Sequence, residues 1–118
     1  KIQPLPDEVQ LSFYRIAQEA LNNVVKHAQA RNVTVSLSET QLVPDSNQLM
    51  SRTVSLVIQD DGVGFSAKNQ QSSHLGINIM RERASLIKST YSIESEPGHG
   101  TLVSLIWCNV LKSDIHDE

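Results

Sequence analysis

Four short groups of polar and glycine residues in this sequence could bind a ligand, and the first lies on a predicted helix. Glu19, Asn23 and His27 are spaced four residues apart, so they line one helix face, with Lys26 close to Asn23. An asparagine oxygen can bind Mg²⁺ without adding negative charge beside a triphosphate, and a lysine can neutralise phosphate oxygens. A solvent-exposed helix surface explains the same pattern, although asparagines in mid-helix have poor helix propensity.

The second group is Asp-Asp-Gly-Val-Gly at residues 60–64, which follows a predicted strand. Gly62 and Gly64 permit a positive φ and let a ligand approach the backbone closely. The carboxylate of Asp60 can accept a hydrogen bond from a purine amino group. Taken alone, an ordinary turn explains this pattern equally well.

The third and fourth groups combine glycines with the start of a helix and with a turn. Gly76, within residues 74–77, precedes a predicted helix, whose N-terminal amides can then meet phosphate. Two arginines that follow in this helix are equally explained as surface charges. Residues 98–101, Gly-His-Gly-Thr, end in Thr101 and would alone be a plain hairpin turn.

The periodicity of apolar residues indicates the elements that must position these groups. Apolar residues at helical spacing begin at Leu11, whereas Val33, Val35 and Leu37 alternate with polar residues, as in a half-buried strand. The resulting order of helix, hairpin, helix and hairpin predicts a two-layer α+β sandwich. The pattern predicts helices over 7–28 and 77–87 and strands over 33–38, 53–59, 91–93 and 101–107.

The composition predicts one domain. The chain has 118 residues, of which 39% are hydrophobic, enough for a core without disulfides or metals. We expect residues 1–6 to be a linker and residues 109–118 a flexible tail. Cys108 lies in an apolar run and is interpreted as a small buried core residue, and a reducing, cytoplasmic setting fits a single cysteine.

The charge and hydropathy exclude several classes of protein. A formal net charge of -3 argues against a nucleic-acid-binding face, which needs a basic surface. No stretch approaches the roughly 20 apolar residues that cross a bilayer, and no signal peptide is present. Because the chain does not begin with methionine, we interpret it as a piece of a longer protein, which can still be anchored in the inner membrane.

Together, the four groups resemble the catalytic domain of sensor histidine kinases, in the superfamily that includes gyrase, the heat-shock chaperone ATPase and MutL. Residues 18–28 resemble the N box, residues 60–64 the first glycine box and residues 97–101 the closing turn. Residues 74–84 closely resemble the second glycine box of the nitrate/nitrite-sensor subfamily. The resemblance runs from about residue 11 to residue 105.

The resemblance implies a mixed, mostly antiparallel sheet of about five strands, covered on one face by about three helices. It also implies a mobile lid over ATP at residues 65–75. Its roles for single residues are Asn23 as Mg²⁺ ligand, Glu19 as a polarising or general-base-like group, Lys26 as a phosphate contact, His27 as a further nucleotide-binding residue, Asp60 as reader of the adenine amino group, Gly62 and Gly64 as the adenine pocket floor, Gly76 at the phosphates and Thr101 near the adenine.

Two positions depart from the family pattern. Lys88 and Ser89 stand where the family often has a glycine pair, so the geometry at that helix end is in doubt. His74 stands where many relatives carry glycine.

The family reaction implied by this resemblance moves the γ-phosphoryl group of Mg-ATP to a histidine and then to an aspartate of a response regulator. The acceptor histidine normally lies on a helical dimerisation domain upstream, and none of the four histidines of this chain has that context. We therefore expect the isolated domain to be monomeric and to bind ATP without phosphorylating itself.

Two other classes remain open. One is a serine kinase of the anti-sigma-factor type, or a hydrolysing ATPase of the gyrase or MutL type. Residues 80–83 argue against both, because they resemble the histidine kinase branch. The other class is a degenerate docking domain without activity, against which the intact Asn23, Asp60 and glycines argue.

Overall fold

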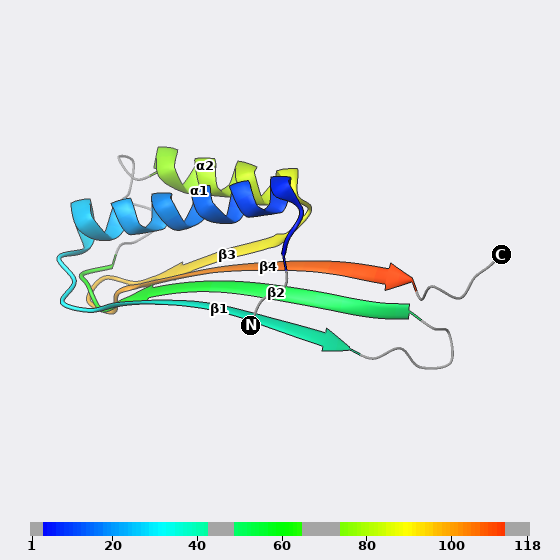
Figure 1. Cartoon of the computed structure of the whole chain (residues 1–118). Helices are drawn as coiled ribbons and strands as arrows, with labels where there is room; N and C mark the ends of the chain where they lie inside the picture. The colour runs from blue at the N-terminus through cyan, green and yellow to red at the C-terminus, as the bar shows by residue number, and fades with distance from the viewer. Residues whose placement is uncertain (1–3, 43–48, 65–73, 113–118) are drawn as a thin grey trace.

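The computed structural model describes residues 4–42, 49–64 and 74–112. Two α-helices lie on one face of an antiparallel sheet with the strand order β1-β2-β4-β3, which makes a two-layer α+β sandwich (Figure 1). The elements in chain order are α1 (Asp7–Asn23), the π-helical turn η1 (Val24–Ala28), β1 (Val33–Leu42), β2 (Leu49–Asp60), α2 (His74–Leu86), β3 (Thr90–Ser95) and β4 (Thr101–Lys112).

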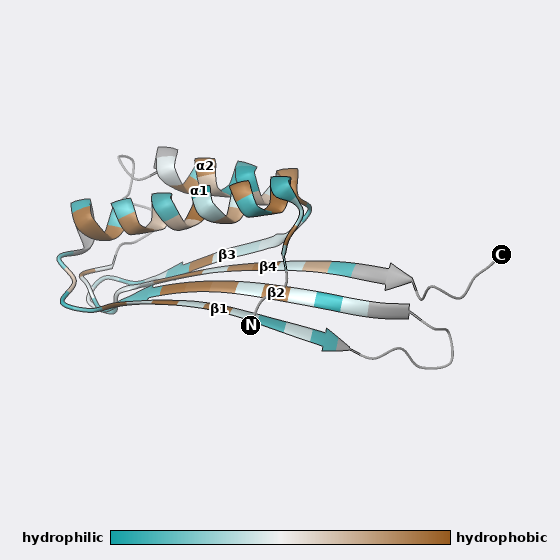
Figure 2. Ribbon diagram, in the orientation of Figure 1, coloured by the Kyte–Doolittle hydropathy of each residue, from teal (hydrophilic) through white to brown (hydrophobic). Residues whose placement is uncertain are grey.

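The core lies between the helices and the two central strands. Helix α1 turns an apolar stripe toward the sheet, and alternate residues of β2 and β4 point back at it (Figure 2). Ile16, Met80 and Leu105 are completely buried, and each such side chain stabilises the fold by about 1.5–3 kcal/mol. Within the described ranges, no helix is both long and apolar enough to span a bilayer. The other buried core residues are Val9, Phe13, Ala20, Val54, Leu56, Ile58, Ile77, Ala84, Ile87, Val103 and Trp107.

The first strand is half buried, but its apolar face is covered less than the apolar faces of the central strands. Val33, Val35 and Leu37 are 42%, 50% and 48% exposed. The register places Val35 beside Ile58 and Leu37 beside Leu56, so the apolar residues do point to the helix-covered face. Helix α1 packs over β2 and helix α2 over β3, which leaves the edge strand β1 without a helix above it.

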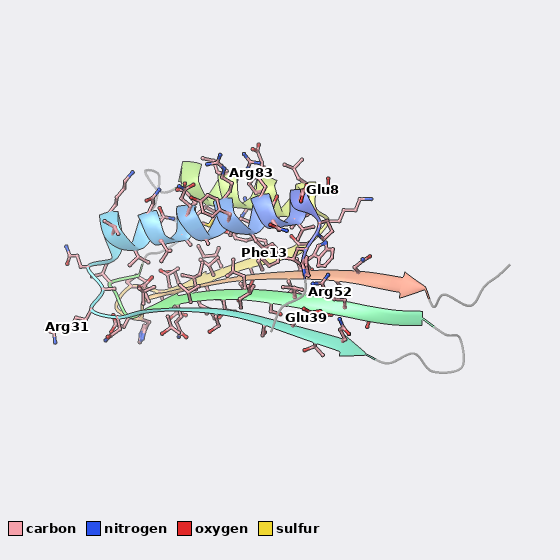
Figure 3. The ribbon with its side chains drawn as sticks, in the orientation of Figure 1. Glu8, Phe13, Arg31, Glu39, Arg52 and Arg83 are labelled. Carbon is pink, nitrogen blue, oxygen red and sulfur yellow. The ribbon has the colours of Figure 1, made fainter. Side chains whose placement is uncertain are left out.

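A buried ion pair fastens the opposite end of the sheet from the predicted site residues. Arg52 Nε lies 2.7 Å from a carboxylate oxygen of Glu39, and its guanidinium lies 5.9 Å from the centre of the Trp107 ring (Figure 3). Arg52 Nη1 also donates to the carbonyl oxygen of Pro4 at 3.1 Å. Residues 4–6 of the predicted linker are therefore attached to the sheet, and Leu5 packs against the core.

Several boundaries and counts differ from the sequence-based expectations. The described part of the chain has four strands, all antiparallel to their neighbours, and two α-helices with one π-turn, instead of about five mixed strands and three helices. Residues 109–112 belong to β4, because they pair with the beginning of β2, so the predicted tail starts too early. Cys108 is exposed, since strand alternation points it away from the helices, opposite to its neighbour Trp107.

Helix α2 begins at His74, about three residues before its predicted start. The last two residues of the predicted lid, 74 and 75, are therefore helical. The remainder of the predicted lid that follows residue 64 lies outside the described residues.

Candidate functional site

All the predicted site residues come from segments that meet at one end of the domain. Helices α1 and α2 run in opposite directions, so the C-terminal end of α1 and the N-terminal end of α2 lie together (Figure 1). Strand β2 ends at Asp60 and strand β4 begins at Thr101, and these two residues are direct partners in the sheet. The fold therefore gathers at one end groups that are up to about eighty residues apart in the sequence.

Glu19, Asn23 and Gly76 form the helical side of this site. The side chains of Glu19 and Asn23 are half buried on α1. A Cβ atom added at Gly76 would collide with the carboxylate of Glu19 and would lie 3.5 Å from Asn23 Oδ1. Because glycine has no Cβ atom, α2 approaches these two side chains closely without displacing the carboxylate of Glu19. The structure thus brings together the residues that the resemblance assigns to the metal (Asn23), to the phosphates (Gly76) and to a polarising or general-base-like role (Glu19).

The last turn before β1 is a π-helix and not the α-helix that the sequence predicts. Residues 24–28 take this geometry, and Gln29 ends it with a left-handed φ of 52°. Such single π-turns often lie at functional sites. Lys26 is exposed on this turn, three residues beyond Asn23. The side chain of His27 is outside the described part of the structure, so its role remains a prediction.

Asp60 and Thr101 form the strand side of the site. Asp60 is only 7% exposed, and its Oδ1 accepts the N–H of the buried Gly62 at 2.7 Å. Within the described residues, the other oxygen of this carboxylate has no hydrogen-bond partner. Thr101 Oγ1 lies 2.8 Å from Ser95 Oγ, a residue to which the sequence gave no role. Asp60, Ser95, Gly100 and Thr101 all line an open cavity of about 480 Å³.

The glycine turns pack directly against each other. Gly100 has a φ of 77°, and a Cβ atom there would collide with the carbonyl oxygen of Asp60. Gly64 packs in the same way against the backbone of Glu96, and Gly98 N–H donates to the carbonyl oxygen of Val63 at 2.6 Å. Gly64 and Gly100 thus fix the turn that follows Asp60 through close contacts between backbones.

Asp61 is a residue of this region that the sequence analysis did not single out. Its Oδ1 accepts the backbone N–H groups of Arg31 and Asn32, each at 2.9 Å, and its Oδ2 accepts Asn32 Nδ2 at 2.9 Å. The hydrogen bonds from the backbone and side chain of Asn32, with a smaller one from Arg31, lower the pKa of Asp61. The only signal in the sequence was a second aspartate beside Asp60 and an asparagine just before a strand.

The oxygen atoms of Asn23 and Glu19 suit a Mg²⁺ ion whose remaining ligands come from phosphate and water. Asn23 Oδ1 and the Glu19 carboxylate lie next to the same glycine. In the described ranges no three His, Cys, Asp or Glu side chains form a metal-binding group. Mg²⁺ commonly takes one or two protein oxygens and completes its shell with phosphate and water, and this arrangement provides that number.

Gly76→Ala should weaken nucleotide binding while leaving the fold intact. The added methyl group meets the end of the flexible Glu19 side chain, which can turn away at little cost to stability. Turning away moves that carboxylate from its place beside Asn23, so we expect ATP affinity to fall by about tenfold. Thermal unfolding and an ATP titration on the same sample measure both effects. A loss of stability with unchanged ATP affinity would contradict this role for Gly76.

Comparison with known proteins places this arrangement in a family. The histidine kinase-, DNA gyrase B- and HSP90-like ATPase family matches residues 8–110. The nitrate/nitrite sensor protein NarQ of Escherichia coli is 35% identical over 101 residues, which cover 86% of this chain and 16% of NarQ. The histidine-protein kinase/phosphatase DegS of Bacillus subtilis is 31% identical over 106 residues, which cover 87% of this chain and 25% of DegS.

A solved structure supports the same fold. The histidine kinase domain of the Erythrobacter litoralis EL346 blue-light activated kinase superposes with a TM-score of 0.58 at 22% identity. The superposition covers 91% of this chain and 50% of that one. This chain spans a quarter or less of the lengths of NarQ and DegS. From the match over residues 8–110, the chain belongs to the histidine kinase-, DNA gyrase B- and HSP90-like ATPase family.

Proposed function

We propose that this domain binds Mg-ATP at the end of the sandwich where α1, β2, α2 and β4 meet. We further propose that it transfers the γ-phosphoryl group to a histidine on a separate dimerisation domain of its parent protein. The observation that carries the proposal is the approach of Gly76, at the start of α2, to Glu19 and Asn23. This contact brings the amides of a helix N-terminus next to Asn23, the predicted metal ligand, and Glu19, the predicted polarising or general-base-like group.

The strand side of the site would bind the adenine. Asp60 is buried, and the Gly62 N–H holds one of its carboxylate oxygens in place. The second oxygen would accept a hydrogen bond from the adenine amino group. Thr101, the sheet partner of Asp60, would lie beside the base, and Gly62 and Gly64 would form the pocket floor.

The helical side would bind the phosphates. The backbone amides in the first turn of α2, which includes Gly76, and the ammonium group of Lys26 would supply positive charge for the phosphate oxygens. Asn23 would hold Mg²⁺ through its side-chain oxygen, with His27 as a further nucleotide contact. Mg²⁺, when bound there, would neutralise the negative charge that develops on the phosphate oxygens during transfer.

The reaction would need positioning more than covalent help from this domain. The bond between the γ-phosphorus and its bridging oxygen breaks, a bond from that phosphorus to the histidine nitrogen forms, and ADP leaves. Glu19, held beside Asn23, would polarise the incoming imidazole or accept its proton.

The relatives support the proposed setting of this chemistry. Their names describe a nitrate/nitrite sensor and a signal-transduction histidine kinase. We therefore propose a cytoplasmic domain of a two-component sensor, whose phosphohistidine would pass its phosphoryl group to an aspartate of a response regulator. As an isolated chain, the domain would be monomeric.

A phosphotransfer assay with ATP labelled on its γ-phosphate tests this proposal. The isolated domain should remain unlabelled, because His99 lies in a turn and the acceptor context is absent from the described residues. The parent protein should acquire an acid-labile label, as expected of phosphohistidine. An acid-stable label on the parent, or ATP hydrolysis by the isolated domain at the rate of the parent, would overturn the proposed reaction.

A further inference from the structure

Asp61 joins the two sides of the site. It follows Asp60, the predicted adenine residue, and its carboxylate accepts three hydrogen bonds from Arg31 and Asn32 (Figure 3 labels Arg31). Its own N–H donates to the carbonyl oxygen of Asn32 at 3.2 Å. Every hydrogen bond that the described residues show between segments 29–32 and 60–64 therefore involves Asp61.

Segment 29–32 is also the continuation of the helical side of the site. It follows the π-turn that carries Lys26 and directly precedes β1, which pairs with β2. On its other side, the backbone of Asp61 packs against Gly100, next to Thr101. Asp61 thus lies between the chain that carries the phosphate-binding lysine and the turns that carry the adenine residues.

We propose that Asp61 is a positioning residue that holds the phosphate side and the adenine side of the nucleotide site at a fixed spacing. A nucleotide that contacts both sides binds more tightly when this spacing is fixed, because binding then does not carry the entropy cost of ordering the two segments. A ligand that occupies the adenine side alone gains little. This inference rests on the proposed function for its nucleotide readout.

A carboxylate is well suited to this position. One oxygen accepts two backbone N–H groups of the segment that follows the π-turn, and the other accepts an asparagine amide. The hydrogen bonds are charge-assisted, although the side chain is exposed to solvent. An asparagine can reproduce all three bonds if the amide of Asn32 turns over, whereas an alanine reproduces none.

The test compares Asp61→Ala, Asp61→Asn and Asn32→Asp with the double variant N32D/D61N. Asp61→Ala removes all three bonds, and Asn32→Asp puts two carboxylates face to face. Both should lower ATP affinity by about tenfold, the loss expected for one or two hydrogen bonds. Asp61→Asn, which removes the same charge as Asp61→Ala, should stay within about threefold of the unmodified domain. In the double variant the introduced amide donates to the introduced carboxylate, so ATP affinity should return.

Adenosine supplies the discriminating readout, since it reaches the adenine side only. Its affinity should change by less than about twofold in every variant. A variant that only destabilises the fold would lower the affinities for ATP and adenosine together, or would change neither. Glu8→Gln, at the opposite end of α1 (Figure 3), is the matched control for a lost surface carboxylate.

Two sets of outcomes would overturn the inference. One is unchanged ATP affinity in Asp61→Ala. The other is a parallel loss for ATP and adenosine, or a failure of N32D/D61N to recover ATP affinity.

Amide hydrogen exchange over residues 24–32, measured without nucleotide, separates this inference from the proposed function. The inference expects faster exchange there in Asp61→Ala than in Asp61→Asn, and equal exchange in both would contradict it. If the unmodified domain binds no ATP but shows this difference, the proposed function is wrong while the contact of Asp61 still positions the segment.

Discussion

Asn23→Ala should lose about 2–3 kcal/mol of Mg-dependent ATP affinity, a weakening of roughly 30- to 150-fold. The side-chain oxygen of Asn23 lies beside Gly76, where the phosphates are proposed to bind. The fold should remain intact, because the side chain is only half buried and alanine has the higher helix propensity. Calorimetric titration with ATP, with and without Mg²⁺, measures the loss.

The neighbouring Asn22 provides a matched control for this substitution. It lies on the same helix but is exposed, so Asn22→Ala should bind Mg-ATP as the unmodified domain does. When a chelator removes Mg²⁺, the difference between Asn23→Ala and the unmodified domain should disappear. Unchanged Mg-ATP affinity in Asn23→Ala, with an intact circular dichroism spectrum, would refute the metal-binding role.

Asp60→Asn should weaken adenosine, ADP and ATP by a similar factor, on the order of ten- to a hundredfold. The reason lies in the hydrogen bond from Gly62 N–H to Asp60 Oδ1. That bond would hold the remaining oxygen of the amide, so the introduced nitrogen takes the place of the oxygen proposed to meet adenine. Two donors then face each other, whereas the carboxylate offered an acceptor.

The same geometry predicts a change in base preference. Guanine carries an acceptor at the six-position, so the unmodified domain should bind GTP poorly, and Asp60→Asn should narrow the gap between GTP and ATP. Asp7→Asn, at the far end of α1, is the control for replacing an exposed acid by its amide. GTP that competes as well as ATP on the unmodified domain, or a loss for ATP without one for adenosine, would show that Asp60 does not read the base.

The sequence predicted the elements correctly because their apolar periodicities are long and regular. It predicted their ends less well, because local pattern says little about pairing between strands. The polar C-terminal stretch predicts a tail from residue 109, yet β4 continues to residue 112 because the start of β2 pairs with it. Arg52 looks like a surface residue in the sequence, but it is 8% exposed because Glu39 and Trp107 surround its guanidinium.

Burial in β1 could not be predicted from alternation alone. Val33, Val35 and Leu37 alternate as residues of a covered strand do, but coverage depends on where the helices lie across the sheet. Likewise, the π-turn at residues 24–28 has no distinct sequence signature, so a continuous helix was the natural prediction.

At the site, the motifs predicted which residues are involved, but not the contacts that depend on how the chain folds. Motif resemblance identified Glu19, Asn23 and Gly76, which the fold does bring together, and also Asp60 and Thr101, which the structure shows as partners in the sheet. It gave no role to Asp61, whose contact with Asn32 joins positions 29 residues apart, or to Ser95, which meets Thr101 where β3 pairs with β4. Such contacts depend on the register of strands and turns, which a motif does not contain.

Titration of the isolated domain with ATP in the presence and absence of Mg²⁺ tests the central claim most directly. We expect saturable binding of one ATP per chain with Mg²⁺ present. Binding should be markedly weaker after chelation, because the oxygen atoms of the helical side can bind the phosphates only through the metal ion. ATP affinity that is unchanged by chelation, or the absence of binding by a domain with a folded circular dichroism spectrum, would contradict it.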